Sequence, residues 1–270
     1  MKKTKLRLAT THLDRHNERF SVGALESMVE QSNERIIPLG SEHDPRITPL
    51  GRVIHTELVK LEDGEFAVEG VAEIYNGEFE GLEDVGNREI PVRKYQNESY
   101  KIVTDRNFRD EQSKKDIQEL KELLNNAETE EEIKKALDPI SILTIGGAFI
   151  LGGIANGFLG GIGSDAYEAL KKKLKEIFSQ PVPNGQEKLF TFDTTINDRN
   201  HSVNVEVILT NPSVDDIQEF FDNGIKQLDQ VLPRHFNNDN GFARIVFDYK
   251  KDNLKLKFAV KKDGIPVYPE

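Results

Sequence analysis

The sequence predicts an α+β protein, and three observations support this fold class. Residues 1–108 contain several β-like segments and one helical pattern. Residues 109–178 contain helical patterns on both sides of an uncharged, glycine-rich segment, and residues 188–270 follow a β-β-α-β-β order. A chain of 270 residues suggests two domains, each long enough to bury a core of its own.

Residues 1–108 are predicted to form a mainly β domain with one helix. Ser21 is a typical N-cap residue, and Leu25 and Val29 lie on the apolar face of the helix that it begins. Asp63-Gly64 is a typical hairpin turn, because these residue types adopt positive φ at low cost. Around these landmarks we expect strands at residues 6–12, 36–39, 52–61, 66–74 and 100–104.

Residues 109–138 are predicted to form a charged helical connector. Ile117, Leu120 and Leu123 fall at helical spacing. Thr129 with Glu132 matches a capping box, so we expect a second helix that contains Ile133, Ala136 and Leu137. Charged residues of both signs cover the other faces. The connector is therefore either a solvated spacer or a docking surface for a partner helix.

Residues 139–164 are the most unusual part of the sequence, because they carry no charge. The segment exceeds the roughly 20 residues that cross a hydrocarbon core, and eight of its 26 residues are glycine. Each glycine inside a soluble helix costs about 1 kcal/mol relative to alanine, so another interaction must offset that cost. In lipid, Gly153, Gly157 and Gly161 form a ladder for close helix packing, and Asn156 can hydrogen-bond across the interface.

A second interpretation places the same segment inside the protein. It is then a buried helical hairpin with its turn at Gly152-Gly153, and neither arm is long enough to span a membrane. Both interpretations stay open at the level of the sequence.

Residues 165–178 are predicted to form a basic amphipathic helix that belongs to the same module, residues 139–178. Tyr167, Leu170, Leu174 and Phe178 line one side. The other side carries four lysines that we expect at lipid headgroups, each worth about 1 kcal/mol near an anionic surface: Lys171, Lys172, Lys173 and Lys175. A proline- and glycine-containing linker, residues 179–187, follows.

Residues 188–270 are predicted to be a small α+β domain. We expect strands at residues 189–195, 203–209, 243–249 and 254–260. Ser213 is a typical N-cap for the single helix between the two strand pairs.

The composition excludes several classes of function. The absence of cysteine excludes disulfides, thiolate zinc sites and cysteine nucleophiles. A net charge of −11 disfavours nucleic-acid binding. No apolar run follows the basic start Met1-Lys2-Lys3, so we expect a cytoplasmic protein without a secretory signal, recruited conditionally to the inner membrane.

Residues 40–53 read GSEHDPRITPLGRV, and a strand, an Asp-Gly turn and a second strand follow them. His43, Asp44, Pro49, Gly51 and Val53 match a histidine context by which residues 5–105 resemble the phage prohead (capsid-maturation) serine proteases, which share the herpesvirus assemblin fold. The resemblance implies a protease-like β domain, with His43 as the general base and Ser99 as the nucleophile. It leaves the third catalytic member open among five side chains: His12, Asp14, His16, Glu42 and Asp44.

The sequence supports three hypotheses for function. The first is a bacterial effector with a protease-like sensing or assembly domain and a conditionally membrane-inserting segment, a combination that suits antiphage defence. The second is a serine endopeptidase that uses His43 and Ser99, and the third is a non-enzymatic oligomeric scaffold. We expect lipids, a second copy of the chain, and a protein bound by the C-terminal domain as partners, and neither a cofactor nor a metal ion.

Overall fold

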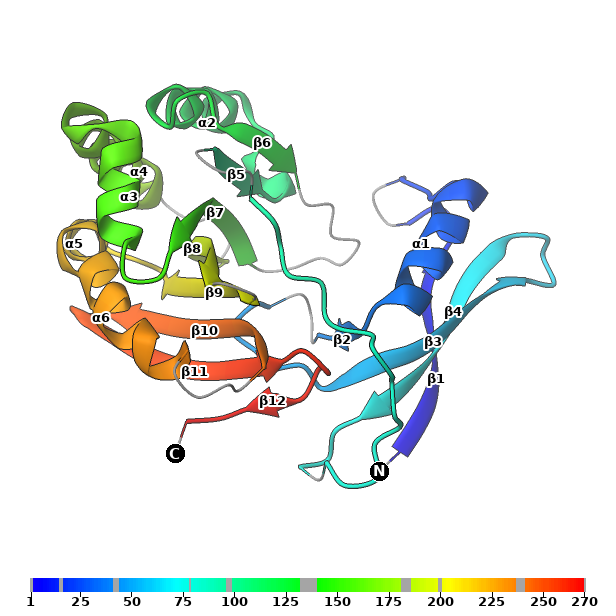
Figure 1. Ribbon diagram of the computed structural model, residues 1–270. Coiled ribbons are helices and arrows are strands. Elements are labelled where there is room, and N and C mark those ends of the chain that lie inside the picture. The colour runs from blue at the N-terminus through cyan, green and yellow to red at the C-terminus, as the bar shows by residue number, and fades with distance from the viewer. Residues whose placement is uncertain are drawn as a thin grey trace. The chain divides into compact units, whose positions relative to one another are not determined.

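The structure is a computed structural model of the chain (Figure 1). It describes residues 2–14, 17–40, 44–77, 79–95, 99–131, 140–180, 186–198, 201–236 and 241–269. It contains both helices and sheets, which confirms the predicted α+β class. Contacts divide the chain into two compact units: Met1–Pro91 with Val260–Val267, and Val92–Ala259 with Tyr268–Glu270.

The first unit is built on a four-stranded antiparallel sheet with the order β1-β4-β3-β2. Its strands are β1 Lys2–Thr10, β2 Ile37–Leu39, β3 Gly51–Lys60 and β4 Phe66–Ile74. Helix α1, Val22–Glu34, packs Leu25 against Ala9 and Val68 of the sheet. The Ser21 side chain accepts a hydrogen bond from Ala24 N, which confirms the predicted N-cap. Gly64 adopts φ 89° in the β3–β4 turn, as the Asp-Gly pair predicts.

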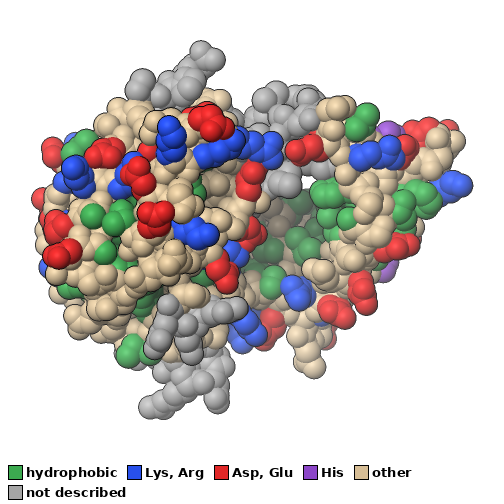
Figure 2. Space-filling model, turned by 90° about the horizontal axis from the view of Figure 1, so that it is seen from above, with side chains coloured by type: hydrophobic (Ala, Val, Ile, Leu, Met, Phe, Trp, Pro, Cys, Tyr) green, Lys and Arg blue, Asp and Glu red, His purple; other side chains and the backbone are tan. Residues whose placement is uncertain are grey.

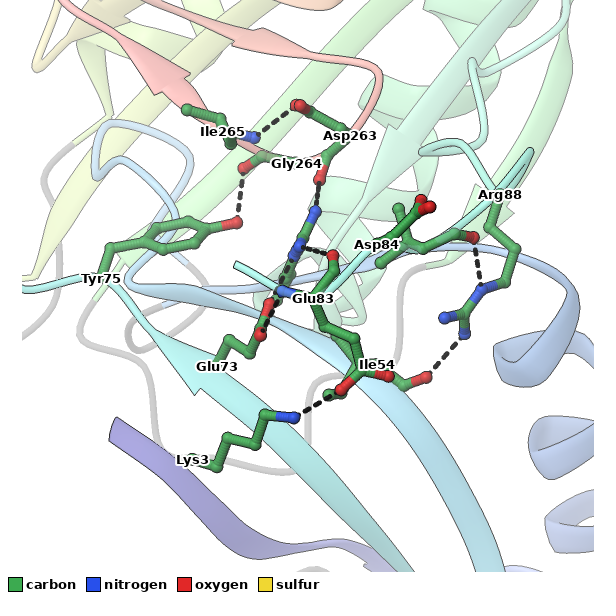
Figure 3. A network of polar contacts seen from close by, with 12 residues as sticks. Lys3, Ile54, Glu73, Tyr75, Glu83, Asp84, Arg88, Asp263, Gly264 and Ile265 are labelled. Atoms are coloured by element: carbon green, nitrogen blue, oxygen red, sulfur yellow. Dashed lines mark hydrogen bonds and ion pairs between the residues drawn. The ribbon is translucent and has the colours of Figure 1, made fainter. Parts of the chain in front are cut away.

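A buried arginine, Arg52, binds the C-terminal segment of the first unit; Figure 3 labels its partners Glu73, Glu83 and Asp263. Arg52 Nε donates to Glu73 Oε2 at 2.9 Å, and the two side chains are 2% and 0% exposed. The other guanidinium nitrogens of Arg52 donate to the backbone oxygens of Asp263 (2.8 Å) and Glu83 (2.7 Å). Tyr75 donates to Gly264 O at 3.0 Å, just before β12, Pro266–Val267. Removing one partner of such a buried pair costs about 3–5 kcal/mol, so the contact is a structural one.

The second unit is built on a mixed sheet with the order β11-β10-β9-β8-β7-β5-β6. Parallel pairs (β5 with β6, β7 with β8, β9 with β10) alternate with antiparallel ones. The strands are β5 Tyr100–Thr104, β6 Glu128–Glu131, β7 Ile140–Ile150, β8 Glu187–Asp198, β9 His201–Thr210, β10 Phe242–Lys250 and β11 Asn253–Lys261.

Helices cover one face of this sheet (Figure 1). They are α2 Glu111–Leu123, α3 Ile154–Ile162, α4 Ser164–Ser179, α5 Val214–Glu219 and α6 Ile225–Phe236, with a π-helical turn, Phe220–Gly224, between the last two. Phe190 and Phe192 of β8 pack against Phe220, Phe221 and Phe158 from the helices. Because every second residue of a strand points to the same face, β8 alternates these phenylalanines with Thr191 and Asp193 on the opposite face.

Several predicted elements of the second unit are confirmed. Residues 165–178 lie in α4, and α2 lies where the first helix of the connector is expected. The C-terminal order is β8, β9, helix, β10, β11, and Ser213 forms a full capping box with Asp216. The connector, the glycine-rich segment and the C-terminal part all contribute strands to one sheet.

Two predictions for the middle of the chain are wrong. Thr129 lies in a strand, β6, rather than at the start of a second connector helix; residues 132–139 lie outside the described part of the chain. The glycine-rich segment is neither one helix nor a helical hairpin, because its first half is β7 and only its second half is helical, as α3. The turn predicted at Gly152-Gly153 is present, with Gly152 at φ 74°. Pairing with β5 and β8 fixes β7, and no local helical pattern reveals such pairing.

Candidate docking element

The candidate functional site is the exposed surface of residues 150–164, which we call the docking element. It consists of the end of β7, the turn at Gly152-Gly153 and helix α3. No side chain in this stretch is charged, although 31% of the whole chain is charged. Two large apolar side chains on it face outward: Ile150 is 71% exposed and Leu159 is 41% exposed. The absence of charge together with two exposed large apolar side chains makes this surface a candidate binding site.

Polar groups from distant elements hold both ends of α3. The carboxylate of Asp229, on α6, accepts hydrogen bonds from Ile154 N and Ala155 N at 2.9 Å each. At the other end, the side-chain amide of Asn125 donates to Gly161 O at 2.5 Å. A carboxylate at a helix N-terminus satisfies free N–H groups and complements the helix dipole. Asp229 therefore replaces the N-cap side chain that Gly153 does not have.

The glycines of the predicted ladder allow α3 to lie close to the sheet. A Cβ on Gly161 would overlap the Tyr100 hydroxyl, which donates to Phe158 O at 3.3 Å. A Cβ on Gly157 would approach the Phe149 ring of β7 to 2.9 Å. Gly153 lies against Ile150, and Asn156 is exposed. The ladder thus faces β5 and β7 of its own chain, which offsets the low helix propensity of glycine.

Three side chains anchor the buried face of α3. Ile154, Phe158 and Ile162 are 0%, 1% and 8% exposed. The Phe158 ring packs edge-on against Tyr100 and Phe192, with centroids 5.4 Å away in each case. The helix is therefore apolar on its buried face and uncharged on its exposed face.

The four lysines of α4 do not form the free basic face that the sequence predicts. Lys171 forms ion pairs with Asp222 and Glu168 at 2.7 Å, and its side chain is only 4% exposed. Lys173 pairs with Asp116 at 2.8 Å and Glu119 at 2.5 Å. Lys175 donates to Gln218, while Lys172 is exposed. The sequence could not show these pairs because, apart from Glu168 on α4 itself, the partners named here lie on α2, α5 and the π-helical turn, far along the sequence.

The electrostatics of this helix follow from these pairs. Burial by itself would lower the pKa of Lys173, but the hydrogen bonds to Asp116 and Glu119 outweigh burial and raise it. For Asp222, burial by itself would raise the pKa, but the hydrogen bonds from Lys171 and Gln218 outweigh burial and lower it. Figure 2 shows acidic and basic side chains next to each other, rather than in separate patches, over the face it presents.

The structure describes only some of the residues on which the protease resemblance depends. Ser99 is half-buried immediately before β5, in the second unit. His43, His16 and Glu42 lie outside the described residues. Of the other candidates for the third member, Asp44 binds the Arg46 guanidinium at 2.7 Å, His12 Nε2 lies 2.8 Å from Asp63, and Asp14 accepts a hydrogen bond from Glu18 N. The catalytic assignment therefore stays a prediction.

Neither a metal cluster nor a spanning helix emerges from the part of the chain that the structure describes. Its described residues contain no group of three or more His, Cys, Asp or Glu side chains placed to hold a metal ion. None of the described helices is long and apolar enough to cross a membrane.

Sequence reasoning missed the three residues that hold α3, namely Asp229, Asn125 and Tyr100. Asp229 is 75 positions from Ile154, and Asn125 is 36 positions from Gly161. No local pattern links residues at that separation. The glycine spacing was the one usable signal, because it predicted a close-packed helix face.

Comparison with known proteins adds nothing to this description, since no family model, curated protein or solved structure matches the chain.

Proposed function

We propose that the protein is a non-enzymatic effector that docks on a lipid bilayer through its docking element, residues 150–164. The observation that carries this proposal is the exposure of Ile150 and Leu159 on a surface without charged side chains. Moving a charged side chain into a bilayer costs free energy, so a surface that docks on lipid should carry no charge. The 15 residues of the docking element meet this condition.

Binding at the interface of the bilayer fits the length of α3 better than crossing does. A helix of nine residues is about 14 Å long, whereas the hydrocarbon core is about 30 Å thick. Strand β7 stays in the protein in this proposal, because in lipid its backbone groups would lose their partners on β5 and β8. The proposal thus narrows the inserting segment from residues 139–164 to residues 150–164.

The packing of α3 makes the docking conditional. Exposing Ile154, Phe158 and Ile162 to water costs about 1.5–3 kcal/mol for each side chain. A bilayer returns most of this energy, since hydrocarbon solvates apolar side chains about as well as the core does. Asp229 and Asn125 hold the helix until it is released.

Electrostatic attraction contributes little in this proposal. Lys171 and Lys173 are already paired with carboxylates inside the protein. Binding should therefore depend weakly on salt and on the anionic lipid content, in contrast to a basic amphipathic helix.

Vesicle flotation tests the proposal directly. Phosphatidylcholine vesicles with and without 30% phosphatidylserine are mixed with the wild-type chain, Leu159→Lys and the matched control Val214→Lys. Val214 is 42% exposed on α5, so the control adds the same charge to an equally exposed site elsewhere. We expect Leu159→Lys to lose binding and Val214→Lys to keep it. Equal flotation of all three proteins, or no flotation even of an Asp229→Ala variant in which α3 is released, would contradict the proposal.

A further inference from the structure

A second polar cluster, separate from the docking element, surrounds Asp193 in the second unit. Asp193 lies in β8 on the sheet face opposite the helices, and its side chain is 2% exposed. Its Oδ2 accepts hydrogen bonds from Arg93 Nη1 at 2.6 Å and from the Tyr95 hydroxyl at 2.7 Å. Its Oδ1 is buried and has no hydrogen-bond partner among the described residues. Burial therefore removes Oδ1 of Asp193 from water without a hydrogen bond from the described residues to replace the lost hydration.

The charged groups around Asp193 come from three elements. Glu206 of β9 is its register partner, and Arg244 of β10 binds Glu206 through two hydrogen bonds of 2.8 and 2.6 Å. Arg93 and Tyr95 come from the segment Val92–Tyr95. On the other side, β7 presents Gly146, over which the Tyr95 hydroxyl lies. When Asp193 and Glu206 are both ionised, their charges balance those of Arg93 and Arg244. Protonation of one carboxylate leaves the cluster with a net positive charge.

Arg93 lies at the start of the second unit, so the charge balance around Asp193 acts on this part of the chain. Val92 is the first residue of the second unit, so the chain passes from one unit to the other next to the cluster. The backbone of Arg93 is held by neutral contacts, with its N–H donating to Asn204 and its carbonyl accepting from Thr195 and Asn204. The Arg93 side chain is 45% exposed, so water can solvate the guanidinium once its partner is neutral.

We propose that Asp193 is a proton-operated latch on the segment Val92–Tyr95, which holds Arg93 while it is ionised and releases it on protonation. The neutral contacts from Asn204 and Thr195 remain, so a proton loosens the segment without detaching it.

The latch operates in a mildly acidic range. Burial, followed by the nearby charge of Glu206, raises the pKa of Asp193 to about 6, although Arg93 and Tyr95 act to lower it. A folded-state pKa above the ordinary value means that the folded protein binds this proton more tightly than the unfolded chain. The contribution of Asp193 to stability is thus fully present below about pH 4 and declines as the pH rises through about 6.

Hydrogen exchange of the segment, corrected for the intrinsic effect of pH, tests the release. We compare the wild type, Asp193→Asn as a permanently neutral form, and Glu206→Gln, which keeps Asp193 and Arg93 but removes the neighbouring negative charge that raises the pKa of Asp193. Exchange in residues 92–95 of the wild type should be about fivefold faster at pH 5.0 than at pH 7.5. Asp193→Asn should be fast at both pH values. Glu206→Gln removes a charge that raises the pKa of Asp193, so its acceleration should move to lower pH. Wild-type exchange that is unchanged by pH would overturn the latch.

Thermal unfolding gives an independent readout. Asp193→Asn removes a buried charge, so its melting temperature should exceed that of the wild type at pH 7.5, and the difference should shrink at pH 4.5. A melting temperature below that of the wild type at pH 7.5 would mean that ionised Asp193 is simply a stabilising partner, and it would overturn the proposal.

Discussion

Strand β7 and helix α3 come from one uncharged, glycine-rich stretch of sequence, yet the structure fixes them in different ways. β7 is paired along its full length with β8, and five of its eleven residues, Leu143–Gly147, are paired with β5 as well. α3 is a surface helix held by three buried side chains and by polar contacts at its ends. Similar composition therefore does not imply similar mobility. Strand pairing fixes β7 in the core along its whole length, whereas α3 is held by a few contacts that can be released.

The difference also decides which part of the stretch is a candidate for binding. Removing β7 from the protein would break the sheet of the second unit. Releasing α3 would break end contacts and expose three apolar side chains, which a bilayer accommodates. The following predictions test this contrast, beginning with the largest expected change in stability.

Gly146→Ala should show how firmly β7 is fixed. The added Cβ would overlap the buried Tyr95 hydroxyl and displace it from Asp193, so we expect the free energy of unfolding to fall by about 2–3 kcal/mol. Gly147→Ala is the matched control, because its Cβ meets Phe149 and Tyr100 only at 3.2–3.3 Å and should cost less. Urea denaturation measures both variants, and equal losses would contradict the close approach at Gly146.

Gly161→Ala and Gly160→Ala should have opposite effects on α3. Alanine at 160 meets no atom within 4 Å, so its better helix propensity should raise the free energy of unfolding by up to about 1 kcal/mol. Alanine at 161 overlaps the Tyr100 hydroxyl, and overpacking should cost about 1–2 kcal/mol. If the two variants are equally stable in urea denaturation, α3 does not lie against β5 as described.

Asp229→Ala should produce the smallest change in global stability and the largest change in the docking element. Loss of the contacts to Ile154 N and Ala155 N should cost about 1 kcal/mol. Amide exchange in residues 154–162 should accelerate, and vesicle binding should increase relative to the wild type. Asp222→Asn, which removes an acidic partner of Lys171 on a neighbouring helix, is the control and should leave vesicle binding unchanged.

Much of the fold was predictable where local chemistry decides it. Ser21 and Ser213 marked two helix starts, and Asp63-Gly64 marked a hairpin turn, all of which the structure confirms. β6 and β7 were missed, because Thr129 with Glu132 imitates a capping box and the apolar run at 140–150 suits a helix as well as a buried strand. Only pairing with β5 and β8 separates these alternatives.

The candidate site was predictable in location but not in mechanism. The absence of charge and the glycine spacing selected residues 139–164, and Gly157 and Gly161 do form a close-packed helix face. The contacts that hold α3 come from Asp229, Asn125 and Tyr100. Two of the four lysines of α4, Lys171 and Lys173, form ion pairs with Asp222 and Asp116. Such long-range partners leave no periodic trace in a single sequence.

The central claim, that the surface of α3 enters a bilayer while the rest of the stretch stays in the protein, is tested most directly by a tryptophan placed on it. The chain contains no tryptophan, so Leu159→Trp introduces a single reporter, and Val214→Trp on α5 is the equally exposed control. On addition of phosphatidylcholine vesicles to the Asp229→Ala background, the emission of Trp at 159 should shift to the blue and become accessible to lipid-borne quenchers, while emission at 214 stays unchanged. Emission that is unchanged at both positions, or shifted equally at both, would contradict the account.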